Sequence, residues 1–234
     1  MTIGCTGIGG VLVVPFLIYA LGLPARMAIA VALWSYLLSG PVAVLFYARR
    51  GSIPWSRTAW LCLAALPAAY LGARALEVVP PSVLEGLIAA LLVLAGLHAL
   101  RGRDARASAP RELKRGALAA LGGVTGFGSA LIGAGGAVIL VPLLIALGEP
   151  VLAAVGMSQA IQVPIAAVAS AANLRAGTVD LRLGTLLAAA LAVGIAVGTP
   201  LAHALPQERL RRLVGWTMLL AGGAILIRLL AGRA

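Results

Sequence analysis

Two glycine-rich clusters in this sequence have a composition suited to binding a solute. Glycine weakens a helix interior by about 1 kcal/mol relative to alanine and readily adopts positive φ, so a helix is expected to break at both clusters. Such a break leaves backbone N–H groups unpaired at the positive end of the next helix, which favours a bound anion. Each cluster also carries a hydroxyl residue: Thr6, Gly7, Gly9 and Gly10 in the first, and Ser129, Gly133, Gly135 and Gly136 in the second.

Close helix–helix packing is the alternative interpretation of these glycines, because small residues also line helix contacts in membranes. A single cluster would favour packing. The occurrence of two matching clusters favours broken helices, whose ends form solute sites near the middle of the bilayer.

Polar side chains follow each cluster at helical spacing. Ser35 and Ser39 are four residues apart and therefore share one helical face. Farther along, Ser158 and Gln159 precede Gln162 by four and three residues. Each residue taken alone is expected to hydrogen-bond a neighbouring helix. Together with the hydroxyls at the breaks, they form a candidate neutral cage for a solute.

Arg49 and Arg175 lie at the ends of predicted helices. Long basic side chains commonly reach from such positions to the lipid head groups, which makes an interfacial anchor the first interpretation. The alternative is that the two guanidinium groups guide an anion at the mouth of its pathway.

Composition places all of these residues in an all-α integral membrane protein. Hydrophobic residues make up 62% of the 234 residues and charged residues 11%, whereas soluble domains have roughly 45–50% and about 25%. We expect about eight transmembrane helices, since a crossing needs roughly 20 apolar residues. The predicted spans are 25–48, 57–76, 83–100, 151–174, 183–205 and 210–230, with two glycine-interrupted regions at 1–21 and 116–147.

The chain is expected to consist of two homologous halves. Pro15 and Pro142 end similar aliphatic runs 127 residues apart, and Pro24 and Pro150 end similar Leu-Gly-x-Pro motifs 126 residues apart. Such internal similarity indicates a duplicated unit, with the first element of each half broken at its glycine cluster. The predicted organisation is a first transmembrane repeat at 1–104, a cytoplasmic basic linker at 105–114 and a second transmembrane repeat at 115–234.

Several classes of function are excluded or disfavoured. The net charge of +11 could indicate nucleic-acid binding, but the basic residues occupy short breaks between apolar runs, as in cytoplasmic loops. No Cys and His residues have zinc-site spacing, and no nucleophile and base are grouped as in an enzyme. We therefore expect no nucleic-acid partner, metal, cofactor or catalytic activity.

Orientation follows from the basic linker, which we place in the cytoplasm. If 116–147 crosses the membrane once, the two halves run parallel; if it dips in and returns, they are inverted. Loop charge favours the single crossing slightly.

The glycine-break, aliphatic-run and proline pattern resembles that of the TauE/SafE family of sulfite-exporter-like permeases over nearly the whole chain. The resemblance is carried by Gly7-Ile-Gly-Gly-Val-Leu-Val-Val-Pro15 and Gly133-Ala-Gly-Gly-Ala-Val-Ile-Leu-Val-Pro142, and by Arg-Arg-Gly51-Ser and Arg-Ala-Gly177-Thr. It implies a transporter of sulfite, sulfoacetate or related small organosulfur anions. The family's common third glycine is replaced here by Val11 and Ala137, which leaves the substrate open.

Direction is inferred from the scarcity of acidic residues. No carboxylate or histidine is placed at mid-membrane as a proton relay, and a negative cell interior favours outward anion movement by about 2.3 kcal/mol per charge per 100 mV. The expected function is export of a small anion, such as sulfite or a small organosulfonate, across a bacterial inner membrane. A channel and an uptake permease are the alternatives, a membrane enzyme is less favoured, and a homodimer is left open.

Overall fold

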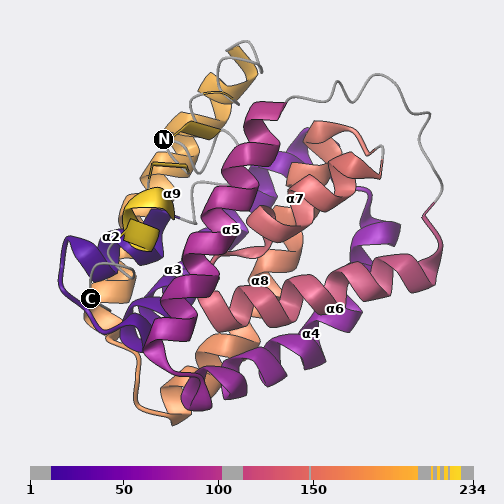
Figure 1. Cartoon of the computed structure of the whole chain (residues 1–234). Coiled ribbons are helices and arrows are strands. Elements are labelled where there is room, and N and C mark those ends of the chain that lie inside the picture. The colour runs from indigo at the N-terminus through magenta and orange to yellow at the C-terminus, as the bar shows by residue number, and fades with distance from the viewer. Residues whose placement is uncertain are drawn as a thin grey trace.

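The computed structural model describes residues 12–101, 113–147 and 149–204, together with 212, 215, 216, 219, 220 and 222–227. Within these ranges the regular structure is helical and contains no strand, so the all-α prediction is confirmed for them (Figure 1). The helices are α2 (Val13–Tyr19), α3 (Ala25–Arg49), α4 (Trp55–Val78), α5 (Pro81–Arg101), α6 (Arg115–Ile132), α7 (Gly136–Ala146), α8 (Val151–Arg175) and α9 (Leu181–Ala204).

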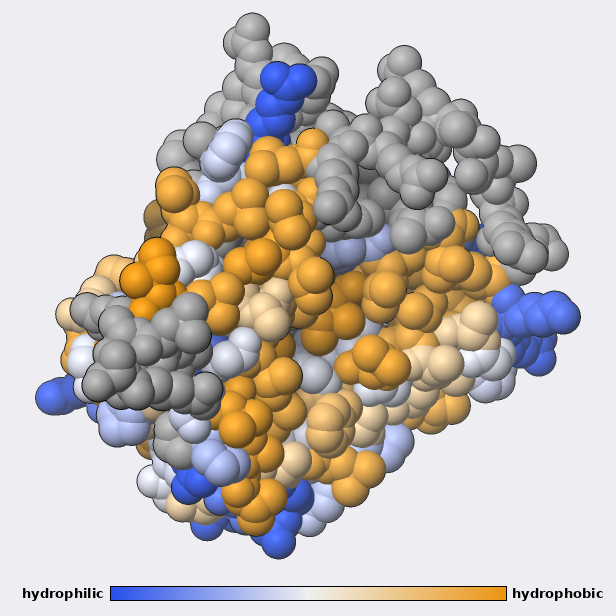
Figure 2. All heavy atoms as spheres, viewed as in Figure 1, coloured by the Kyte–Doolittle hydropathy of each residue, from blue (hydrophilic) through white to orange (hydrophobic). Residues whose placement is uncertain are grey.

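The protein is a multi-pass membrane protein by the length and composition of these helices. Four of the described helices can cross a bilayer: α3, α4, α6 and Leu152–Arg175 within α8; shorter apolar stretches occur in α5 and α9. Figure 2 shows apolar side chains across the middle of one face and hydrophilic residues toward its margins. The predicted span 210–230 is described only in part, so about eight crossings stays a prediction.

Proline and glycine set the bounds of α3 and α8. Pro24 and Pro150 immediately precede the two helices, where the fixed φ of proline and its missing N–H cost little. Gly51 and Gly177 follow them with φ of +65° and +69°, a conformation that ends helices. Both helices have 25 residues, and both α4 and α9 have 24. The starts of α3 and α8 are 126 residues apart, as are those of α4 and α9.

Helices α3 and α8 nevertheless run in opposite directions. The end of α3 meets the start of α8, since a Cβ on Gly156 would lie 2.7 Å from the carbonyl oxygen of Ser52. At the other end of the bundle, Arg26 from the start of α3 and Arg175 from the end of α8 line one cavity. We refer to these two ends as the Arg57 end, where α4 begins, and the Arg175 end.

The segment α6–α7 enters the bundle at the Arg57 end and returns to it. The guanidinium of Arg115, at the start of α6, lies 5.4 Å from the centre of the Trp60 ring near the start of α4. Glu149, just after α7, forms an ion pair with Arg57 in the first turn of α4. The single crossing that loop charge slightly favoured for 116–147 is therefore wrong: α6 and α7 form a hairpin.

Small residues allow α6 to lie directly on α4, and Figure 1 shows the two helices side by side. Gly122 and Gly126 face the carbonyl groups of Leu61 and Ala65, and a Cβ on Gly126 would lie 2.5 Å from the Ala65 oxygen. Such close backbone approach is how membrane helices gain packing energy where lipid provides no hydrophobic drive.

We predict that Gly126→Ala lowers the stability of the purified protein by about 1–3 kcal/mol, because the added methyl forces α4 and α6 apart. Gly123→Ala is the matched control, since a Cβ there meets nothing within 4 Å. Alanine at that position should leave the stability unchanged or raise it by up to about 1 kcal/mol. Thermal unfolding in detergent measures both, and equal unfolding temperatures would contradict the packing argument.

We also predict that both ends of the α6–α7 hairpin are reached from one side of the membrane. In a cysteine-free background, Lys114→Cys and Pro150→Cys should react with a membrane-impermeant maleimide from the same side, and Arg182→Cys from the opposite side. All three positions are exposed. Labelling of Lys114→Cys and Pro150→Cys from different sides would show a single crossing instead.

Candidate functional site

The interruption predicted for 116–147 is confirmed at its glycine cluster. Helix α6 ends at Ile132, and α7 begins at Gly136. Gly133 and Gly135 between them have φ of +63° and +67°, a backbone region that costs L residues roughly 1–2 kcal/mol. The Gly133 N–H donates to the Ser129 carbonyl at 3.0 Å and closes α6.

The break is enclosed by protein rather than lipid. Every residue from 129 to 138 is buried. The α carbon of Gly133 faces Val14 of α2 and Ile29 of α3, and Gly136 faces Ile161 of α8. Non-helical backbone at membrane depth is tolerated only inside protein or beside a water-filled space, and this arrangement satisfies that condition.

Two predicted site residues of α8, Ser158 and Gln162, lie beside the start of α7. A Cβ on Gly135 would lie 3.4 Å from the Gln162 side-chain oxygen, and one on Gly136 would lie 3.2 Å from the Ser158 carbonyl oxygen. Ser158, Gln159 and Gln162 are all buried. The start of α7 therefore lies beside the Gln162 side-chain amide and the Ser158 carbonyl of α8.

Two buried hydroxyls of α6 lack hydrogen-bond partners among the described residues. They belong to Ser129, which the sequence predicted, and Thr125, which it did not. Both side chains are fully buried, and an unsatisfied buried hydroxyl costs roughly 1–3 kcal/mol. Their four-residue spacing on α6 is the signal that could have identified Thr125.

The other predicted hydroxyls are already engaged within their own helices. Ser35 donates to the Ala32 carbonyl at 2.7 Å, Ser39 to the Ser35 carbonyl at 2.8 Å, and Ser158 to the Val155 carbonyl at 2.7 Å. These hydroxyl protons are not offered to a solute in this conformation. The glycine cluster of the first half lies outside the described residues, with its four predicted site residues Thr6, Gly7, Gly9 and Gly10.

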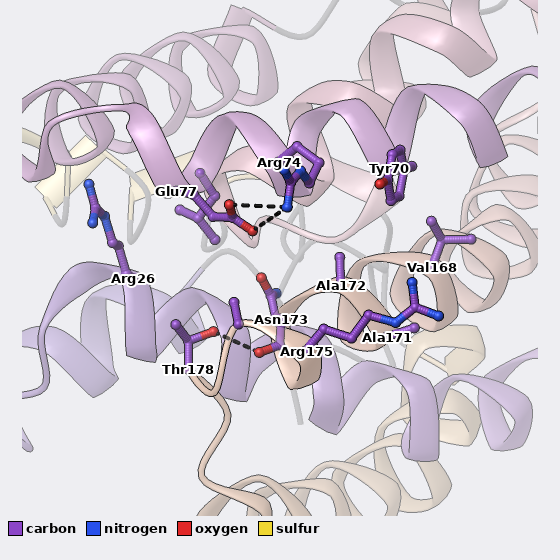
Figure 3. Close-up of a pocket in the computed structure, with 12 residues that line it drawn as sticks. Arg26, Tyr70, Arg74, Glu77, Val168, Ala171, Ala172, Asn173, Arg175 and Thr178 are labelled. Carbon is purple, nitrogen blue, oxygen red and sulfur yellow. Dashed lines mark hydrogen bonds and ion pairs between the residues drawn. The ribbon is translucent and has the colours of Figure 1, made fainter.

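Arg49 and Arg175 lie at opposite ends of the bundle, because α3 and α8 are antiparallel. Arg49 is exposed at the Arg57 end. Arg175 lines a cavity of about 650 Å³ between α4, α8 and the start of α3. Figure 3 shows this cavity, with Asn173 pointing from α8 toward α4 and the Arg175 side chain extending along α8 toward Val168.

Within the described ranges, no three His, Cys, Asp or Glu residues are close enough to share a metal ion. The polar groups at the break are neutral hydroxyls, amides and backbone N–H groups.

Comparison with known proteins agrees with a transport role. Neither the curated proteins nor the solved structures contain a match to this chain. A family model described as Sulfite exporter TauE/SafE matches residues 1–225. Because this match covers nearly the whole sequence, the chain belongs to the sulfite exporter TauE/SafE family of membrane transporters.

Proposed function

We propose that this protein is a carrier of the bacterial inner membrane that exports a small oxyanion, such as sulfite or a small organosulfonate. The anion binds at the α6–α7 break, near mid-membrane, between two homologous halves at 1–104 and 115–234 joined by the linker 105–114. The observation that carries this proposal is the enclosed helix break, where α7 begins beside Gln162 and the last turn of α6 carries the unpaired Ser129 hydroxyl.

The start of α7 supplies the main attraction for the anion. The first N–H groups of a helix have no intrahelical acceptor, and the helix dipole places about half a positive charge there. Because Gly135 has no side chain, it does not separate these backbone N–H groups from the side-chain amide of Gln162. A bound oxyanion would accept hydrogen bonds from backbone N–H groups, the Gln162 side chain and the Ser129 hydroxyl.

Neutral donors suit a transport site, because such a site must not hold its anion too tightly. A full positive charge at mid-membrane is expensive, and a site that moves ions must bind them strongly enough to receive them yet weakly enough to release them. Dipoles and hydroxyls meet both needs. Among the described residues that face the break, none carries a charge.

The two ends of the bundle differ in a way that supports a carrier over a channel. At the Arg57 end, the Arg57–Glu149 ion pair and the close contact of Gly156 with Ser52 hold the elements together. At the Arg175 end there is a cavity. A carrier opens to one side at a time, whereas a channel needs a path open to both.

Charge assigns the two ends to the two sides of the membrane. Arg49, Arg50, Arg57, Lys114 and Arg115 all lie at the Arg57 end, which we place in the cytoplasm by the positive-inside rule. The cavity then opens outward. Arg49 and Arg175 would serve as guides at the inner and outer mouths, and the antiparallel α3 and α8 fit inverted repeats that exchange roles during transport.

We predict that reconstituted protein releases sulfite from liposomes and that a potential negative inside accelerates the release. Each charge gains about 2.3 kcal/mol per 100 mV on leaving a negative interior. Efflux is measured with a sulfite-sensitive dye at several imposed potassium diffusion potentials. A flux equal to that of protein-free liposomes would refute transport of sulfite, and a flux independent of potential would refute electrically driven export.

We predict that Ser129→Ala raises the KM for sulfite about tenfold, because one hydrogen bond to a charged ligand contributes roughly 1.5 kcal/mol. The stability of the ligand-free protein should not fall, since the lost hydroxyl has no partner among the described residues. Thr58→Val is the matched control, because the buried Thr58 hydroxyl donates to the Pro54 carbonyl at 3.0 Å. The Thr58→Val substitution should lower the stability by about 1 kcal/mol and leave the KM for sulfite unchanged. Lower stability and unchanged KM in Ser129→Ala would give Ser129 a structural role.

A further inference from the structure

We infer that the cavity at the Arg175 end is a second anion-binding site, separate from the helix break, that takes an oxyanion group carried on an apolar chain. The cavity has a volume of about 650 Å³ and lies between α4, α8 and the start of α3. Its polar and charged walls include Arg26, Tyr70, Arg74, Glu77, Asn173 and Arg175.

Positive charge exceeds negative charge in this cavity. Arg74 is paired with Glu77 at 3.3 Å on the α4 side (Figure 3). Neither Arg26 nor Arg175 forms an ion pair with any residue that the structure describes. Asp180 lines a neighbouring hollow with Arg26, but its carboxylate accepts the Leu183 N–H at 2.9 Å at the start of α9. Two guanidinium groups are therefore left to attract an anion.

Helix capping accounts for only part of this arrangement. Arg26 donates through Nη2 to the Val79 carbonyl at 3.1 Å, just after α4 ends, and arginine is favourable at helix C-termini. Its Nε–H, however, is buried without a partner among the described residues, and so is the Nδ2 of Asn173. Asn173 is only 2% exposed.

The unpaired donors of Arg26 and Asn173, in a cavity with two guanidinium groups that form no ion pair among the described residues, fit an oxyanion, whose several oxygens accept charge-assisted hydrogen bonds at once. Arginine is suited to planar, paired recognition of sulfonate, phosphate and carboxylate groups. Buried donors of this kind cost free energy until an acceptor reaches them. An oxyanion that accepted hydrogen bonds from these donors would remove that cost.

The remaining walls select an organic anion over a bare inorganic one. Leu76, Val168, Ala171 and Ala172 line the same cavity, and ligand sites of roughly 300–1,000 Å³ usually combine apolar walls with a few polar groups. Sulfite would fill a small part of this volume. Two sources supply the required chemistry: a free alkanesulfonate-like solute, or the head group of an anionic lipid whose chains lie on the outer surface.

The site is placed to receive anions that leave the break toward the outside. Val168, in the cavity wall, lies six residues beyond Gln162 on α8, which corresponds to about 9 Å of helix. Anion binding in the cavity does not require that the break itself transports sulfite, so the two proposals can fail separately.

Binding of methane-, butane- and hexanesulfonate to the purified full-length chain in neutral detergent tests the inference. Calorimetry should show affinity rising with chain length. Arg175→Gln should raise the Kd of butanesulfonate at least tenfold, and Arg175→Lys should restore part of the affinity. Arg182→Gln is the matched control, because Arg182 is exposed near the same end and should bind as the parent does.

Nanodiscs separate the two sources. If the occupant is a free solute, the Kd of butanesulfonate will be the same in phosphatidylcholine and phosphatidylglycerol nanodiscs. If it is a lipid, phosphatidylglycerol will weaken butanesulfonate binding, and Arg175→Gln will lose phosphatidylglycerol molecules that the parent retains in native mass spectra. The inference is overturned if Arg175→Gln and Arg182→Gln bind butanesulfonate and phosphatidylglycerol alike, or if the parent binds neither.

Discussion

The structure depends on one constraint, which is that backbone N–H and C=O groups inside a membrane need partners. A chain that leaves the helical conformation at Gly133–Gly136 meets this constraint only if protein surrounds the break. The described contacts show how that is achieved, with α2, α3 and α8 each contributing a neighbour to the break. The tight seating of α6 on α4 through Gly122 and Gly126 closes another side of the same region. An enclosed site and a closely packed hairpin are thus two consequences of one requirement.

Local signals made much of the fold predictable from sequence. Apolar runs with proline before and glycine after them located α3 and α8, and the glycine cluster located the α6–α7 break. The direction of α8 relative to α3 was not predictable in this way, because it depends on whether α7 goes on across the membrane or returns. Loop charge was nearly balanced between the two arrangements. The length of α7 is the more informative quantity. Its 11 residues span about 16 Å, which is half of the hydrocarbon core and too short for a crossing.

The site shows the same division between local and tertiary information. Gly135, Gln162 and Ser129 were predictable because a helix break and helical spacing are properties of neighbouring residues. Whether a buried hydroxyl is free is not such a property: Ser39 is paired within its helix, and Ser129 has no partner among the described residues. Arg175 was predicted as a residue of the pathway mouth, but its grouping with Arg26 and Asn173 was not predictable, because the three line one cavity only through the packing of α3, α4 and α8. Arg49 and Arg175 are 126 residues apart, as Pro24 and Pro150 are, which suggested like positions, whereas the antiparallel helices α3 and α8 put them at opposite ends.

The two proposed anion sites use different kinds of positive potential, and depth explains the difference. Full charges are costly at mid-membrane, so the break relies on the α7 dipole and neutral donors. At the Arg175 end, Arg26 donates to the Val79 carbonyl just after α4, and Arg175 lines the cavity; long basic side chains near helix ends can keep their charged groups in water. A weakly binding interior followed by a charged, water-facing cavity lowers the barrier for an anion to leave the membrane interior. Salt in the surrounding water screens the guanidinium charges, which limits how long the anion stays in the cavity.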